Sequence, residues 1–511
     1  MTSAIANVTL PGPSDLAVLS PELMLVGAVT AILLGAAVRG KRTVLIPLLA
    51  IVACFAAAGL AAAMSAGLAV QSTAFSKLIV PDRLACFVRM LIYSFTGLLG
   101  VMWMITARYR PGEKSAANAP EFFTLLLSAA VGMGLMASTG NLLMVLIALE
   151  LASLPSYALA GFQKDKRPGA EAALKYVVFG AAAAAVMVYG ISLLYGVYST
   201  LDAGAIASGI RDAGGTIPLA GVIGLIALGL GLAFKISAFP MHFWCPDVFE
   251  GANVEVTTFL SVASKAAALT LLLRLALTIA GFAENAAATA TAPTPAAAVA
   301  VGAVIAAVAA LTATVGNLAA MAQNNLKRLL AYCYIAHAGY MLMGVAILSG
   351  RTGVAAILLY LLVYLFMNLG AFSVVALVFN ATGREDLAGL SGLGRRNPLL
   401  AACMTLFLVS LIGIPPMAGF FAKYQLFYAL FVHKLQWLVA VGLVNTLFSL
   451  FYYMRIVKAM YLERSDAPPL RVPAVGLVWV VILAVPVTVL AVVWQPLTYL
   501  AEKFSRVLGA P

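Results

Sequence analysis

The strongest constraint on this chain is a series of apolar runs, each about as long as a bilayer is thick. A membrane-spanning helix needs roughly 20 apolar residues. Runs of this kind occur fourteen times, at about 22–38, 43–66, 84–107, 120–138, 141–162, 170–197, 216–242, 254–280, 296–321, 328–349, 353–381, 398–431, 435–461 and 473–497. Of the 511 residues, 63% are hydrophobic and only 10% are charged, which excludes a soluble globular protein. We predict an all-α polytopic membrane protein with about fourteen transmembrane helices.

Basic residues are distributed unevenly between the connecting segments. Alternate connections hold sixteen Lys and Arg residues, against seven on the opposite side. Because Lys and Arg collect in cytoplasmic loops, this bias predicts that both termini lie outside the cytoplasm. It also explains the net charge of +12 without nucleic acid as a partner. The five cysteines form no CxxC pair and the three histidines lie far apart, so no cofactor or metal site is predicted in this chain.

Ionisable residues at membrane depth are costly and are usually functional. Glu150 is the one acid well inside an apolar run, and we expect it to pair with a buried lysine from another helix. A fixed ion pair that orders the helix bundle is the structural alternative. Several mid-span lysines, among them Lys235, Lys265 and Lys423, favour a proton or ion path instead.

Two of the apolar runs are interrupted by prolines close to a lysine. Pro240 follows Lys235, and the pair Pro415–Pro416 precedes Lys423. Because proline lacks an N–H group, the helices are expected to break there. The freed carbonyls must then find water or side-chain partners, and they belong to Ile236, Leu411 and Ile412.

The interrupted helices, the seventh and the twelfth, are five spans apart. A shift of five spans reverses the orientation in the membrane, so the chain fits two inverted five-helix repeats. The predicted organisation has four parts. They are a three-helix segment (1–118), helices 4–8 (119–280), helices 9–13 (281–461), and helix 14 with a tail (462–511).

Three further residues complete the candidate set. Lys265 lies about twelve residues into its run and has no acid within a helical turn. His337 is equally compatible with packing and with function. Lys175 has Glu171 four residues earlier near a span end, which favours an interfacial salt bridge. We expect a polar, hydrated strip near the membrane midplane that joins Glu150, Lys235, Lys265 and Lys423.

Long stretches of the sequence resemble one family. ALELASLPSYALAGF, EAALKYVVFGA, GLAFKISAFPMHFWCPDVFEGANVEVTTFLSVASKAA, GNLAAMAQNNLKRLLAYCYIAHAGYMLMG and LIGIPPMAGFFAKYQLF are similar to the antiporter-like subunits of bacterial proton-translocating NADH:quinone oxidoreductase, respiratory complex I. Among these, subunit N is the best match, because the eighth helix reads SVASKAA and the twelfth carries Lys423. GANVEV replaces the family's usual GAPTPV.

The resemblance implies a fold, a site and partners. It implies fourteen helices with two inverted repeats, and a proton path through a paired Glu150 and Lys235, then Lys265 and Lys423. The partners would be other membrane-arm subunits of complex I, including antiporter-like sister subunits, and lipids. FMN, iron–sulfur clusters and quinone would belong to partner subunits. The location would be the bacterial inner membrane, with both termini periplasmic.

Two other functions remain compatible with the same residues. A Mrp-type sodium/proton antiporter subunit or a membrane-bound hydrogenase subunit is built on the same module. A passive membrane subunit would use the buried charges only for assembly. Co-purifying partners distinguish the first alternative, and replacement of Lys235 or Lys423 distinguishes the second.

Overall fold

The computed structural model describes residues 12–39, 45–67, 74–75, 77–107, 118–163, 166–279, 296–348, 351–464 and 468–505. Within these ranges every regular element is a helix, apart from isolated β-bridges. Twelve helical segments are long and apolar enough to cross a membrane. They are α2 (Ser20–Arg39), α3 (Leu45–Gly67), α4 (Arg83–Thr106), α5 (Ala119–Ala137), α6 (Leu142–Ala160), α7 (Arg167–Tyr198), α9 (Leu219–Ile236), the segment Val254–Ile279, α13 (Ala296–Met321), α15 (Arg351–Thr382), α19 (Gln436–Tyr461) and α20 (Ala474–Val492).

The remaining two predicted spans are also helical. One is α14 (Leu326–Val345), and the other consists of two shorter apolar helices, α17 (Pro398–Ile412) and α18 (Ala418–Val432). The prediction of an all-α polytopic membrane protein is therefore confirmed. The shorter elements are α1 (Pro13–Val18), α8 (Ala203–Asp212), α10 (Trp244–Gly251), η4 (Leu387–Leu390), α16 (Leu393–Arg396) and α21 (Trp494–Phe504). Seven basic residues that entered the orientation count lie outside the described residues, as does the boundary at 280–281; they are Lys41, Arg42, Arg108, Arg110, Lys114, Lys164 and Arg506.

Both predicted helix breaks are present. The helix α9 ends at Ile236, Ser237 adopts the left-handed conformation (φ 62°), and the chain resumes helical geometry in α10. In the second break α17 ends at Ile412 and Gly413 has φ 86°, a region that glycine enters without steric cost. The helix α9 thus ends before Pro240, and this proline lies in the connecting segment rather than at a kink within a continuous helix.

The segment Val254–Ile279 is irregular in a way that the sequence did not predict. It consists of α11 (Val254–Phe259), one π-helical turn η3 (Leu260–Ser264) and α12 (Lys265–Ile279). Single π turns within α-helices are frequent at functional sites. Here the π turn ends at the residue before Lys265.

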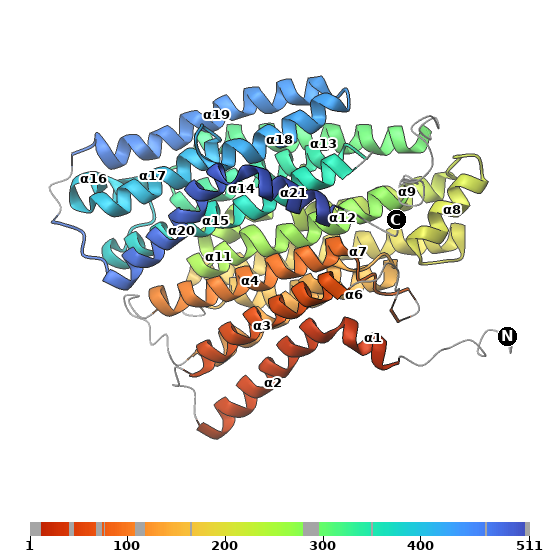
Figure 1. Cartoon of the computed structure of the whole chain (residues 1–511), viewed down its shortest axis with the longest axis horizontal. Helices are drawn as coiled ribbons and strands as arrows, with labels where there is room; N and C mark the ends of the chain where they lie inside the picture. The colour runs from red at the N-terminus through yellow and green to blue at the C-terminus, as the bar shows by residue number, and fades with distance from the viewer. Residues whose placement is uncertain are drawn as a thin grey trace.

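The helices lie side by side, with α2 and α3 at one edge of the view and α19 at the opposite edge (Figure 1). The middle helices are enclosed by protein. In the most apolar stretch of α15 89% of residues are buried, and in that of Val254–Ile279 83%, against 28% in that of α2. Polar side chains on the two enclosed segments therefore face other helices rather than lipid.

Backbone contacts recur at one constant spacing along the chain. Asn141 forms an isolated antiparallel bridge with Asp202, and Asn325 forms the same bridge with Asp386. Each asparagine also caps its helix, α6 or α14, through its side-chain oxygen. The offset from Asn141 to Asn325 equals that from Asp202 to Asp386. Such paired contacts are what two structural repeats would produce, and the boundaries of the repeats stay a prediction.

Candidate functional site

Lys235 is the penultimate residue of α9, and its side chain is fully buried. Its Nζ atom donates a hydrogen bond to Ser153 Oγ at 2.9 Å. Ser153 lies on α6, three residues after Glu150, and its own hydroxyl donates to the Leu149 carbonyl at 2.6 Å. The serine oxygen is therefore free to accept the bond from Lys235.

Glu150 is half-buried, and its Oε1 atom is buried without a hydrogen-bond partner. The direct Glu150–Lys235 ion pair that the resemblance implies is not formed in this structure. Instead, Lys235 contacts the serine one helical turn further along α6. The sequence predicted a buried lysine from another helix as the partner of Glu150, and it gave no indication of the contact with Ser153.

The first helix break is held by contacts from two other segments. Trp244 Nε1 donates to the Phe234 carbonyl at 3.0 Å, which connects α10 to the last turn of α9. The Phe239 N–H donates to Thr312 Oγ1 on α13, also at 3.0 Å. Side chains thus satisfy backbone groups that the break releases from helical hydrogen bonding.

The second break supplies the binding partner of Lys423. The Lys423 Nζ atom donates to the Ile412 carbonyl at 2.9 Å, so this freed carbonyl has the side-chain partner that was expected. The Gly419 N–H donates to Ser410 Oγ at 3.0 Å across the break. Lys423 is 4% exposed, although it lies on α18 near the edge of the bundle.

Lys265 is fully buried, as Lys235 is. Its Nζ atom donates to the Tyr334 carbonyl at 2.7 Å and to the Tyr364 hydroxyl at 3.4 Å. It also lies 3.6 Å from the centre of the Tyr334 ring, within the range of a cation–π interaction. The tyrosines come from α14 and α15, so the packing of distant helices creates this site.

His337 lies between Lys265 and Lys423. Its Nδ1 atom is 2.8 Å from the Tyr360 hydroxyl, and its ring centre is 5.1 Å from that of Tyr364, which contacts Lys265. On the other side, the ring of His337 is 6.0 Å from that of Tyr340, and Lys423 Nζ is 4.5 Å from the Tyr340 ring centre. An imidazole flanked by tyrosines therefore separates the two lysines, rather than continuous aliphatic packing.

Lys175 is 37% exposed and forms the predicted ion pair with Glu171 at 2.8 Å. It also contacts Asp247 of α10 at 2.8 Å. Asp247 is bound in addition by Arg328 NH1 at 2.8 Å, and the same NH1 atom contacts Glu250. Partial burial raises the pKa of Asp247, but the hydrogen bond from Lys175 and the charge of Arg328 outweigh this effect and hold the pKa below its usual value. The Glu171 contact was predicted from sequence, whereas the contacts of Asp247 with Lys175 and of Glu250 with Arg328 were not.

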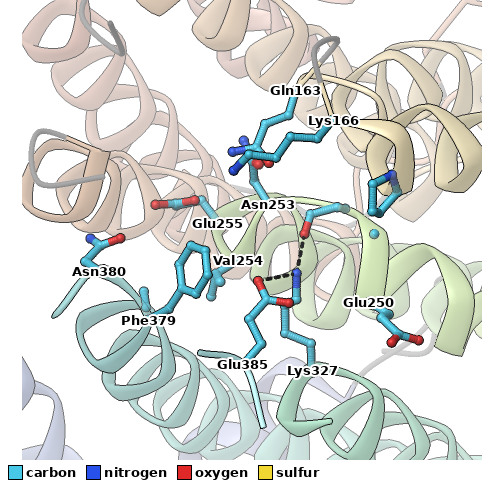
Figure 2. Close-up of a pocket in the computed structure, with 14 residues that line it drawn as sticks. Gln163, Lys166, Glu250, Asn253, Val254, Glu255, Lys327, Phe379, Asn380 and Glu385 are labelled. Carbon is cyan, nitrogen blue, oxygen red and sulfur yellow. Dashed lines mark hydrogen bonds and ion pairs between the residues drawn. The ribbon is translucent and has the colours of Figure 1, made fainter. Parts of the chain in front are cut away.

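A cavity of about 150 Å³, with Glu250 among its lining residues, lies beside this ionic network. Figure 2 shows Lys327 and Glu385 projecting into it from one side, and Gln163 and Lys166 from the other. Lys327 Nζ contacts Glu385 at 2.9 Å and donates to the Ala252 carbonyl at 3.0 Å. Among the described residues no group of three or more His, Cys, Asp and Glu could hold a metal ion.

Comparison with known proteins identifies the family. A family model described as the transmembrane region of NADH:quinone oxidoreductase and Mrp antiporter subunits matches residues 139–449. The chain is 40% identical to NADH-quinone oxidoreductase subunit N 2 of Sorangium cellulosum, over 96% of this chain and 97% of the relative. It is 38% identical to subunit N of an Anaeromyxobacter species, over 84% of each chain. The chain belongs to the subunit N family of NADH-quinone oxidoreductases.

Solved structures agree with this membership. A chain of respiratory complex I from Thermus thermophilus is 31% identical, with a TM-score of 0.75, over 94% of this subunit and 98% of that chain. An archaeal membrane-bound sulfane sulfur reductase and the Mrp complex of a Dietzia species give TM-scores of 0.82 and 0.80. Their identities are 21% and 20%, so they show a shared fold only.

Proposed function

We propose that this subunit N carries protons across the membrane for NADH:quinone oxidoreductase through Glu150, Lys235, Lys265 and Lys423. The observation that carries the proposal is the state of the three lysines. Each is buried within apolar helices, and none forms an ion pair with an acid in the part of the chain that the structure describes. Structural charges at membrane depth are normally paired, because an unpaired ion in a low-dielectric medium is costly.

The chemistry follows from what the lysines contact. Ser153, the Tyr334 carbonyl and the Ile412 carbonyl accept hydrogen bonds from the three ammonium groups without neutralising them. Burial then penalises the ammonium form, and an approaching anion offsets that penalty. A lysine in such a site can accept a proton when a carboxylate approaches and release it when the carboxylate withdraws.

Glu150 is the carboxylate that could alternate in this way. Its Oε1 atom has no hydrogen-bond partner, and Lys235 is bound one helical turn away at Ser153. We propose that Lys235 exchanges between Ser153 and Glu150 during turnover. Separation from Glu150 would favour proton transfer towards Lys265, and His337 with its tyrosine neighbours would carry the transfer on to Lys423.

The surface position of Glu150 also fits assembly with neighbouring subunits. Its helix α6 exposes Ile147 (49%) and Leu154 (62%) on the same part of the chain surface. A half-buried carboxyl on such a face is more favourably placed against another protein than against lipid. We propose other membrane-arm subunits, including antiporter-like sisters, as these partners, with lipids around the remaining surface.

Electron transfer belongs to other parts of the complex in this proposal. FMN, iron–sulfur clusters and quinone would be held by partner subunits, and the coupling to this chain would be conformational or electrostatic. The distribution of basic residues supports insertion in the bacterial inner membrane with both termini periplasmic.

Two experiments test the proposal. Affinity purification of the intact complex should recover NADH-oxidising and quinone-reducing subunits, whereas recovery of Mrp partners would favour an antiporter. In the assembled complex, Lys265→Ala should abolish proton pumping in inverted membrane vesicles. If Lys265→Ala pumped normally, Lys265 would have a purely structural role and the proton path would be refuted.

A further inference from the structure

The short helix α10 connects the surroundings of two of the buried lysines. At its first residue, Trp244 donates to the carbonyl of Phe234, the residue before Lys235. Near its last turn, the ring centre of Phe249 lies 5.3 Å from that of Tyr334. The carbonyl of Tyr334 accepts the hydrogen bond from Lys265. A shift of α10 would therefore alter the packing beside both Lys235 and Lys265.

The opposite side of α10 is held by charged residues that the proton path does not use. Asp247 lies in the middle of α10 and accepts hydrogen bonds from Lys175 of α7 and Arg328 of α14, both at 2.8 Å. Tyr176, which follows Lys175, stacks on Trp244 with ring centres 4.3 Å apart and an interplanar angle of 6°. Asp247 thus joins α10 to two helices at once.

We infer that Asp247 is a positioning residue for the proton path, because its bonds to Lys175 and Arg328 hold α10 against Lys235 and the Tyr334 contact of Lys265. This inference rests on the proposed function of Lys235 and Lys265. An isolated surface ion pair contributes little to stability. Asp247, however, is only 29% exposed and has two cationic partners from different helices, so its loss removes the ion pair between α10 and α7 and leaves Glu250 as the remaining ion-pair partner of Arg328 on α10.

The chain offers a matched control. Glu171 also binds Lys175 at 2.8 Å, but it lies on the same helix as Lys175 and has no ion pair to α10. Glu171→Gln and Asp247→Asn therefore each remove one carboxylate from Lys175, and only the second removes ion pairs that hold α10. Asp247→Glu retains the carboxylate and serves as the conservative variant.

The experiment measures proton pumping per NADH oxidised in the intact complex. We expect Asp247→Asn to lower this ratio by about threefold to tenfold, Glu171→Gln to leave it unchanged, and Asp247→Glu to restore at least half of it. Deuterium uptake in residues 237–251 should rise in Asp247→Asn alone. Equal ratios and equal uptake in Asp247→Asn and Glu171→Gln would overturn the inference.

Parallel variants separate this inference from the proposed function. If Lys235→Ala and Lys265→Ala lose pumping while Asp247→Asn pumps normally, only the role of Asp247 is refuted. If the two lysine variants pump normally, the proton path itself is refuted, and the inference with it. If Asp247→Asn does not assemble, Lys175→Gln and Arg328→Gln each remove one of its partners. Both should then raise deuterium uptake in 237–251 and lower the pumping ratio, and wild-type values in both would overturn the inference.

Discussion

Replacing Ser153 with alanine isolates the contact on which Lys235 depends in this structure. Ser153 Oγ accepts the 2.9 Å bond from Lys235, and the pair is fully buried. A hydrogen bond to a charged group contributes about 1.5–3 kcal/mol. Loss of the acceptor should therefore lower the ratio of protonated to neutral Lys235 by roughly 10- to 100-fold, since 1.4 kcal/mol corresponds to a factor of ten. Protonation of Lys235 would then require a lower pH.

The assay is proton pumping in inverted vesicles as a function of pH, with NADH–quinone turnover measured in parallel. For Ser153→Ala we expect the optimum of pumping to move by about one to two pH units towards acid. Ser156→Ala is the control, because Ser156 is equally buried on α6 and donates to the Ala152 carbonyl at 2.6 Å, as Ser153 does to Leu149. Identical pH profiles for the two variants in assembled complexes would refute the role given to Ser153.

Three further predictions concern the ionisable residues. Glu150→Gln should leave assembly intact but slow turnover and pumping, because Lys235 would lose the anion that stabilises its charge, and wild-type rates of both in an assembled complex would contradict this. Lys235→Ala and Lys423→Ala should impair pumping more than Lys175→Ala, because the first two are buried and Lys175 is 37% exposed; equal losses in all three would show that burial does not rank them. His337→Phe should lower pumping by roughly tenfold or more, because phenylalanine keeps the ring packing but loses the bond to Tyr360. NADH–quinone turnover is measured in parallel. Normal pumping by His337→Phe would make His337 a packing residue.

The helices and their breaks could be predicted because local sequence determines them. A run of about 20 apolar residues has few alternatives to a membrane helix, and a proline removes a backbone donor wherever it stands. The burial of Lys235, Lys265 and Lys423 could also be expected, because a lysine in the middle of a span must avoid lipid. Each of these arguments needs only the residues within one helix.

The partners of the lysines could not be predicted in the same way. The bond from Lys265 to the Tyr334 carbonyl joins residues far apart in the chain, and no periodicity in either helix indicates it. The expected Glu150–Lys235 ion pair is not formed, and the reason again lies in the packing between helices. A serine three residues after a glutamate occupies nearly the same helix face, so the two side chains compete for one lysine, and the packing of α9 against α6 decides between them.

The three lysines share a feature that links their chemistry to the backbone. Lys235 precedes the left-handed Ser237, Lys423 binds the last carbonyl of α17, and Lys265 directly follows a π turn. At each place the helix departs from regular α geometry, and at the second break the freed carbonyl of Ile412 is the neutral acceptor of Lys423. The neutral acceptors of the other two lysines come from neighbouring helices, as the Ser153 hydroxyl for Lys235 and the Tyr334 carbonyl for Lys265. Neutral acceptors stabilise the charged lysine less than a carboxylate does, so they leave the proton exchangeable. The neutral acceptors are therefore as much a part of the proposed proton path as the lysines themselves.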